Sequence, residues 1–137
     1  MANEIRAEIR QVSTSSSEAA IRQHRVLIDR PVAKGGTDTG PMGGELFLAS
    51  VGGCFMSNLL AAIKAREAEV SDVCVEVVGT LADSPARFAG VELRVAAKSR
   101  DQELLEKLVE IADRGCIMMN TLRGTLELRV SIGASGA

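Results

Sequence analysis

Apolar residues in the stretch from residue 44 to residue 66 occupy every side of a helical wheel. They are Leu46, Phe47, Leu48, Val51, Phe55, Met56, Leu59, Leu60 and Ile63. A helix with no polar face must lie inside the fold or between two copies of it. Ser50, Cys54 and Asn58 follow one another at every fourth position, so they share one face of this helix. The pattern therefore predicts a buried helix with a thiol between two small polar side chains.

Alternating apolar and polar residues predict two strand pairs, one before and one after this helix. The first pair is residues 4 to 12 and about Ala20 to Asp29, joined by a turn at 13 to 18. The second pair is Val70 to Ala82 and Phe88 to Lys98. Each pair is expected to form an antiparallel hairpin.

A second, one-sided helix is predicted from about residue 100 to residue 114. Ser99 and Gln102 resemble a capping box at its start, and Gly115 is a typical helix stop. Cys116 follows directly, and we expect a short helical turn at 117 to 123 and a final strand at 125 to 132. This order of elements predicts an α+β fold, with residues 1–137 forming a single domain.

Composition narrows the class of partner. The chain of 137 residues carries 16 basic and 18 acidic side chains, three Phe and no Trp or Tyr. This charge balance and the small number of aromatic rings argue against nucleic acid or an anionic membrane as the main partner. The predicted helix also ends in charged residues, which makes it a poor membrane span. We therefore expect no nucleic-acid and no membrane partner.

The N-terminus lacks the pattern of a secretory signal, so a cytoplasmic location is expected. In a reducing compartment, the cysteines Cys54, Cys74 and Cys116 are not expected to form a structural disulfide framework. They lack metal-binding spacing, and His24 is the only histidine, so a zinc site is not expected. The glycines beside Lys34 lack the spacing of a phosphate-binding loop, and residues 30 to 44 are interpreted as an ordinary loop.

The three cysteines have different sequence surroundings. Cys74 lies in a valine-rich strand and is interpreted as a structural residue. Cys54 lies among polar residues on the apolar helix, and Cys116 follows a helix stop, where a backbone break often faces a cleft. Cys54 and Cys116 are therefore the candidates for chemistry.

The segment Glu45-Leu46-Phe47-Leu48-Ala49-Ser50-Val51-Gly52-Gly53-Cys54, preceded by Gly40-Pro41 and followed later by a second cysteine, resembles the OsmC/Ohr superfamily, and its OsmC-like branch in particular. The resemblance covers nearly the whole chain in element order. It implies an OsmC/Ohr-like fold with antiparallel sheets around a long central helix. It also implies an intertwined homodimer with active sites at the subunit interface.

The same resemblance implies a function. Peroxidases of this family reduce organic hydroperoxides in oxidative-stress defence. By position, Cys54 would be the peroxidatic cysteine and Cys116 the resolving cysteine that forms a disulfide with it. An external dithiol would regenerate the pair, without a metal or an organic cofactor. Ser50 and Asn58 would line the interfacial pocket.

A nucleophilic thiolate needs a stabilising group, and Cys54 lies too far along its helix to use the helix N-terminus. In family peroxidases an arginine from the N-terminal strands provides the charge; the candidates here are Arg22, Arg25 and Arg30. Glu45 starts on the opposite face of the helix from Cys54, so it is expected to serve the helix N-terminus. The chain also has Ile117 where many relatives have proline after the resolving cysteine.

Two other interpretations stay open. The chain could be an OsmC-fold dimer that binds an apolar small molecule or senses redox state, with little peroxidase activity. Alternatively, both cysteines could be core residues of an α+β dimer without chemistry.

Overall fold

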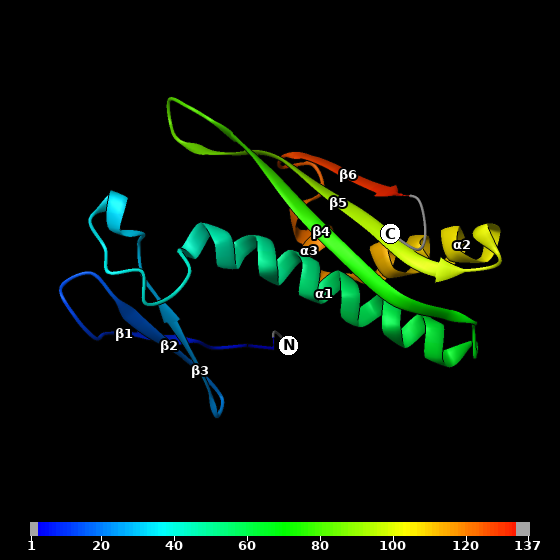
Figure 1. Cartoon of the computed structure of the whole chain (residues 1–137), viewed down its shortest axis with the longest axis horizontal. Helices are drawn as coiled ribbons and strands as arrows, with labels where there is room; N and C mark the ends of the chain where they lie inside the picture. The colour runs from blue at the N-terminus through cyan, green and yellow to red at the C-terminus, as the bar shows by residue number, and fades with distance from the viewer. Residues whose placement is uncertain (1–2, 134–137) are drawn as a thin grey trace. The chain divides into compact units, whose positions relative to one another are not determined.

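The computed structural model describes residues 3 to 133, and the chain forms two compact units, residues 1–47 and 48–137 (Figure 1). The first unit holds β1 (Glu8–Gln11), β2 (Ser17–Ile21), β3 (His24–Ile28) and the short 3-10 helix η1 (Val32–Lys34). Helix α1 (Gly43–Ala65) follows, and then β4 (Val70–Ala82), β5 (Arg87–Ser99), α2 (Gln102–Gly115), α3 (Ile117–Leu122) and β6 (Glu127–Ile132). The single domain stays a prediction.

The first unit is an antiparallel sheet in the order β1-β2-β3. The predicted continuous strand from Ala20 to Asp29 is wrong, because Arg22 and Gln23 form a two-residue turn within it. Arg22 has φ 53°, the left-handed conformation that a tight hairpin turn requires. The sequence hides this turn, because it contains none of the Gly or Asn residues that usually mark one.

Asp29 organises the loop that leads from β3 toward α1. Its side chain is 2% exposed. Its carboxylate accepts hydrogen bonds from the hydroxyls of Thr37 (2.6 Å) and Thr39 (2.9 Å), and from the backbone N–H groups of Arg30, Thr37 and Thr39. The Thr37 hydroxyl, together with the bonds from Thr39 and Arg30, holds the pKa of Asp29 well below its usual range despite its burial. The hydrogen bonds of this loop therefore stabilise the ionised form of Asp29.

We expect the first unit to lose stability below about pH 4, the ordinary pKa of an aspartate in an unfolded chain. The pKa of Asp29 is lower in the folded state. Its contribution is therefore complete above the unfolded value and disappears as the pH falls through the folded value. Asp29→Asn should be less stable than wild type at pH 7 and should lose less stability between pH 4 and pH 2, measured by urea unfolding.

The matched control is Asp38→Asn, which changes an exposed carboxylate of the same loop. Asp38 has φ 56°, a conformation that asparagine tolerates. If Asp29→Asn and Asp38→Asn have the same pH dependence as wild type, Asp29 is not the group that links this loop to acid.

Helix α1 starts with a capping interaction by Glu45. Its Oε1 accepts the backbone N–H of Met42 at 2.8 Å, and the first backbone bond of the helix joins the Leu46 N–H to the Met42 oxygen. Among the described residues α1 is the helix long and apolar enough to cross a membrane by length and composition, a test that core helices also pass. Its buried residues Val51, Gly52, Phe55, Leu59 and Ala62 form one face, which is how a core helix packs.

Burial on α1 is less complete than the all-round apolar pattern predicts. Leu60 is 50% exposed, and Ala49, Gly53, Ser57 and Ala61 are also exposed. In the single chain, α1 thus has one buried face and one exposed face.

The second unit has a sheet in the order β4-β5-β6. Strands β4 and β5 form the predicted antiparallel hairpin, with Val77 opposite Leu93. The expectation of antiparallel sheets is wrong for β6, which pairs parallel to β5 with Leu93 opposite Val130. The reason is the connection: α2 and α3 carry the chain back to the start of β5, and a crossover of this length permits parallel pairing.

Helix α2 begins two residues later than predicted, at Gln102. The N-cap is Asp101, whose carboxylate accepts the Leu104 N–H at 3.0 Å. Ser99, the predicted cap, instead donates its hydroxyl hydrogen to the Asp101 carbonyl oxygen. An ionised aspartate is a strong N-cap because it also favours the positive end of the helix.

The core of the second unit consists of side chains from α1, β5, α2 and α3. The largest fully buried ones are Phe55, Leu59, Leu93, Leu105, Leu108, Met119, Val51, Val91, Val95 and Cys116. Gly52 lets α1 approach β4 closely, since a Cβ on Gly52 would lie 2.7 Å from Val77 Cγ2. The neighbouring Gly53 has no such constraint, because a Cβ there meets no atom within 4 Å.

These two glycines give a matched pair of variants. Both Gly52→Ala and Gly53→Ala should gain about 1 kcal/mol from helix propensity. Gly52→Ala also crowds Val77, which costs about 1–3 kcal/mol, so it should be the less stable of the two. Urea unfolding followed by circular dichroism measures the difference. Equal stability of the two variants would show that α1 and β4 are not in close contact at Gly52.

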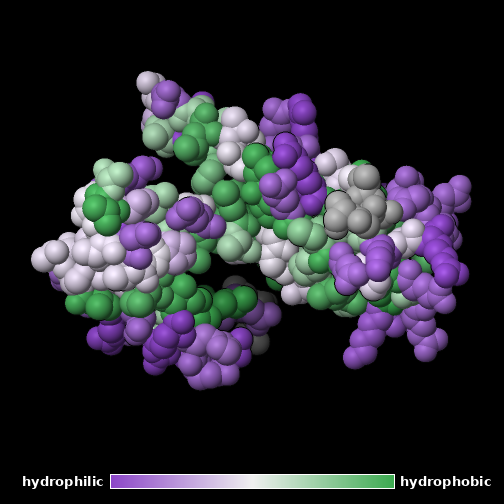
Figure 2. Space-filling view, in the orientation of Figure 1, coloured by the Kyte–Doolittle hydropathy of each residue, from purple (hydrophilic) through white to green (hydrophobic). Residues whose placement is uncertain are grey.

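Large apolar side chains also reach the molecular surface. Figure 2 shows hydrophobic residues at the surface beside hydrophilic ones. In the first unit the exposed large apolar residues are Ile5, Ile9, Val12, Ile21, Leu27 and Val32. A three-stranded sheet of this size does not bury them within the single chain.

Candidate thiol site

Cys54 and Cys116, which we call the thiol pair, lie in contact although 62 residues separate them. The two Sγ atoms are 3.1 Å apart, and both cysteines are free thiols. Cys54 lies in the middle of α1 and is half-buried, whereas Cys116 is 0% exposed. The two Sγ atoms would therefore have to approach each other by about 1 Å to reach the S–S bond length of a disulfide, about 2.05 Å.

The break between α2 and α3 positions Cys116. Helix α2 ends at Gly115, and Cys116 has an extended backbone (φ −82°, ψ 119°) before α3 begins at Ile117. The first backbone bond of α3 runs from the Asn120 N–H to the Cys116 oxygen at 2.9 Å. The N–H groups that precede Asn120 are therefore available to other acceptors.

Ionisation favours Cys54 over Cys116. Burial opposes ionisation of Cys54, but hydrogen bonds from the Met118 N–H, the Cys116 thiol and the Ile117 N–H outweigh it and lower the pKa of Cys54. Burial raises the pKa of Cys116, and the nearby Cys54 sulfur raises it further. The Cys116 thiol is thus the hydrogen-bond donor of the pair, and Cys54 is the sulfur that ionises more readily.

The other polar residues of the predicted helix face have different surroundings. Asn58 donates from its Nδ2 to the Cys54 carbonyl oxygen at 3.2 Å, and the same nitrogen lies 4.0 Å from Cys54 Sγ. Asn58 therefore contacts the thiol pair. Ser50, one turn before Cys54, is exposed.

The three candidate arginines and Glu45 belong to residues 1–47, whereas the thiol pair belongs to residues 48–137. Arg22 forms the β2–β3 turn, and Arg25 lies 3.7 Å from Glu18. Arg30 is exposed at the start of the Asp29 loop. The choice among the three arginines stays a prediction. Glu45 accepts the Met42 N–H, so its carboxylate serves the start of α1.

Cys74, which the sequence pattern identifies as a structural residue, lies at the surface. It is exposed on β4, on the same side of the strand as Glu76. The alternation in this strand places Val73, Val75 and Val77 on the other side, which is the more buried one. Cys74 is therefore a surface thiol away from the core.

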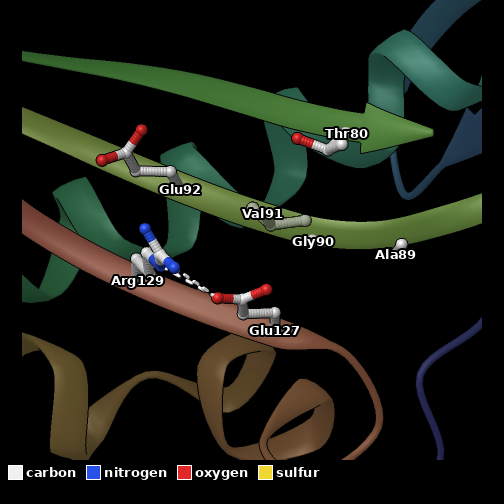
Figure 3. A pocket seen from close by; sticks show the side chains of 7 residues that line it. All are labelled: Thr80, Ala89, Gly90, Val91, Glu92, Glu127 and Arg129. Carbon is white, nitrogen blue, oxygen red and sulfur yellow. Dashed lines mark hydrogen bonds and ion pairs between the residues drawn. The ribbon is translucent and has the colours of Figure 1, made fainter.

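A surface depression of about 250 Å³ lies over the sheet of the second unit, where Ala89 and Gly90 have small or no side chains (Figure 3). Figure 3 shows the ion pair of Glu127 and Arg129 at its rim; Arg129 Nη2 lies 2.5 Å from Glu127 Oε1. The residues that line it are Thr80, Ala89, Gly90, Val91, Glu92, Glu127 and Arg129. The thiol pair is not among them, so this depression is separate from the candidate chemistry.

Two thiols in contact, one of them easily ionised, can exchange two electrons by forming and breaking a disulfide. Fold and site together define a small α+β protein in which two free thiols from distant parts of the chain lie in contact. The chain belongs to the OsmC-like protein family, whose model matches residues 36–131.

Solved structures share this fold. An OsmC-like protein from Mycoplasma pneumoniae is 17% identical, with a TM-score of 0.85 over 99% of this chain and 100% of that one. An organic hydroperoxide resistance protein OsmC from Legionella pneumophila is 21% identical, with a TM-score of 0.75 over 96% of this chain and 97% of that one. The organic hydroperoxide resistance protein OhrB of Bacillus subtilis is 24% identical, with a TM-score of 0.71 over 93% of this chain and 98% of that one. A search of curated proteins gave no match.

Sequence reasoning missed the backbone donors of the site. Hydrogen bonding by the backbone of Ile117 and Met118 lowers the pKa of Cys54, but a backbone group leaves no trace in residue type.

Proposed function

We propose that this protein is a thiol-dependent peroxidase that reduces organic hydroperoxides through Cys54 and Cys116. The observation that carries the proposal is the 3.1 Å contact between a half-buried, easily ionised sulfur and a fully buried one. Similarity in fold to two proteins named for organic hydroperoxide resistance supports the substrate class. No metal or organic cofactor takes part in the proposed reaction.

The proposed cycle has three steps. The Cys54 thiolate attacks the terminal peroxide oxygen, the O–O bond breaks, and the alcohol leaves after taking up a proton, which gives Cys54 sulfenic acid. The Cys116 sulfur then attacks the Cys54 sulfur, an S–S bond forms and water leaves. An external dithiol reduces this disulfide and is itself oxidised to a disulfide. The sum converts one hydroperoxide and one dithiol into an alcohol, water and a disulfide.

We further propose a homodimer in which a second copy covers the exposed face of α1. Two observations support it: apolar Leu60 is half-exposed on α1, and the β1-β2-β3 sheet exposes several large apolar residues. Within such a dimer, Arg22, Arg25 or Arg30 could come from either subunit. Three free thiols fit a reducing compartment, and a cytoplasmic location is proposed on that basis.

The test of the function is steady-state consumption of cumene hydroperoxide with dithiothreitol as the reductant. Wild type should turn over many equivalents, whereas Cys116→Ser should accumulate Cys54 sulfenic acid, detected by dimedone and mass spectrometry. Slow consumption by wild type, together with tight, saturable binding of a fatty ligand, would overturn the peroxidase in favour of a binding protein.

A further inference from the structure

The two sulfurs of the thiol pair differ in what can reach them. Cys116 is 0% exposed, and a partner subunit can only cover more of the chain, so this sulfur is inaccessible to external reagents in the folded protein. Cys54 is half-buried and lies in the middle of α1. A reagent that exchanges with the pair must therefore react at Cys54 first.

The side of α1 next to Cys54 carries small side chains. Gly53 is exposed, and a Cβ placed there would meet no atom within 4 Å. Ser50 and Ser57, about one turn before and after, are also exposed. In the proposed dimer the second copy lies over this face, which narrows the access. The reagent that fits is therefore a small molecule rather than another folded protein.

The second sulfur is in place before any reagent arrives. Cys116 Sγ lies 3.1 Å from Cys54 Sγ, so a group bonded to Cys54 through sulfur has a second thiol beside it in the same molecule. Reactions between groups held in contact in one molecule are strongly favoured over bimolecular ones. Cys54 is also the sulfur that ionises more readily, because hydrogen bonding lowers its pKa. The pair thus has a reachable first nucleophile and a buried second one in contact with it.

We propose that the reduced thiol pair also reduces small disulfides, that is, compounds of low molecular weight that contain an S–S bond. This inference shares its site with the proposed function and adds a second class of oxidant. A thiolate attacks a disulfide sulfur and displaces the other sulfur, as it displaces the alcohol oxygen of a hydroperoxide. The S–S bond therefore requires no group that the thiol pair lacks.

The reaction has two steps. The Cys54 sulfur attacks one sulfur of the external disulfide, whose S–S bond breaks, and the first small thiolate leaves and takes up a proton. The Cys116 sulfur, after giving up its proton, then attacks the Cys54 sulfur of this mixed disulfide, and the second small thiolate leaves and is protonated. One small disulfide and the protein dithiol thus become two small thiols and the Cys54–Cys116 disulfide. The external dithiol of the proposed cycle reduces the protein again.

The test uses hydroxyethyl disulfide, the disulfide of 2-mercaptoethanol, in excess over the reduced protein and without any other reductant. The protein carries Cys74→Ser, which removes the exposed thiol of β4 as a second place of reaction. Released 2-mercaptoethanol and the intact mass of the protein are followed over time. The protein with both Cys54 and Cys116 should release two equivalents, retain no adduct and lose two hydrogen atoms in mass.

Single-thiol variants separate the two steps. Cys116→Ser in the same background should release one equivalent and keep the adduct on Cys54, located by peptide mass spectrometry. Cys54→Ser leaves only the buried sulfur, which should react at least about 100-fold more slowly than Cys74 does in a Cys54→Ser/Cys116→Ser protein. Circular dichroism and urea unfolding verify that each variant is folded.

Three results would overturn the inference. They are no release of 2-mercaptoethanol by the intact pair, a stable adduct on Cys54 while Cys116 is present, and an adduct on Cys116 of folded Cys54→Ser that forms as fast as the one on Cys74.

The assay contains no peroxide, which separates this inference from the proposed function. Release of two equivalents by a protein that consumes no cumene hydroperoxide supports disulfide reduction and removes the peroxidase. Consumption of hydroperoxide by a protein that releases no 2-mercaptoethanol keeps the proposed function and removes disulfide reduction.

Discussion

Cys54→Ser is expected to abolish hydroperoxide reduction, lowering turnover by at least about 1,000-fold. A serine hydroxyl is not ionised near neutral pH and cannot form a disulfide with Cys116. The substitution removes a half-buried sulfur without adding volume, so the fold should persist. The assay is consumption of cumene hydroperoxide with dithiothreitol, at equal concentrations of folded protein.

Cys74→Ser is the matched control, because it makes the same chemical change at an exposed thiol on β4. It should retain wild-type turnover. Equal activity of wild type and Cys54→Ser would contradict the proposed mechanism, and loss of activity in Cys74→Ser alone would move the chemistry to another sulfur.

Phe55→Ala should destabilise the protein by about 3–5 kcal/mol, because it leaves a cavity in a core that packs without voids. Phe55 follows Cys54 on α1 and is 0% exposed. Urea unfolding followed by circular dichroism gives the change in the free energy of unfolding. A cost below about 1 kcal/mol would show that this side chain is not in the core.

Leu60→Ala on the exposed face of α1 is the companion variant. Leu60 is 50% exposed in the single chain, so its truncation should cost far less than that of Phe55 if the protein is a monomer. In the proposed dimer the two costs become similar, and the midpoint of unfolding rises with protein concentration. A midpoint of unfolding that does not depend on protein concentration would contradict the proposed dimer.

The long elements were predictable because their patterns repeat many times. The predicted strand Val70 to Ala82 agrees with β4, and the predicted helix 44 to 66 differs from α1 by one residue at each end. The alternation from Val73 to Val77 within β4 and the 23-residue apolar helix α1 leave little ambiguity in period. The contact between Cys54 and Cys116 was reached only through a family resemblance, since spacing along a chain does not reveal which helix stop faces which helix.

Turns and helix ends were harder to predict because each depends on a single residue. The turn at Arg22 depends on one left-handed residue, and the start of α2 depends on the choice between Ser99 and Asp101 as cap. The parallel pairing of β6 depends on a long-range crossover that no local pattern shows. In the site, the donors from Ile117 and Met118 are backbone groups common to nearly every residue.

The complete burial of Cys116 against Cys54 has a kinetic consequence. Once Cys54 becomes a sulfenic acid, two reactions compete for it: condensation with Cys116 and attack on a second peroxide molecule, which gives a sulfinic acid that a dithiol cannot reduce. The Cys116 Sγ atom already lies 3.1 Å from the Cys54 Sγ atom, whereas a second peroxide molecule must arrive by diffusion. Irreversible inactivation should therefore require far more peroxide than turnover does, and removal of Cys116 should make the protein sensitive to its own substrate.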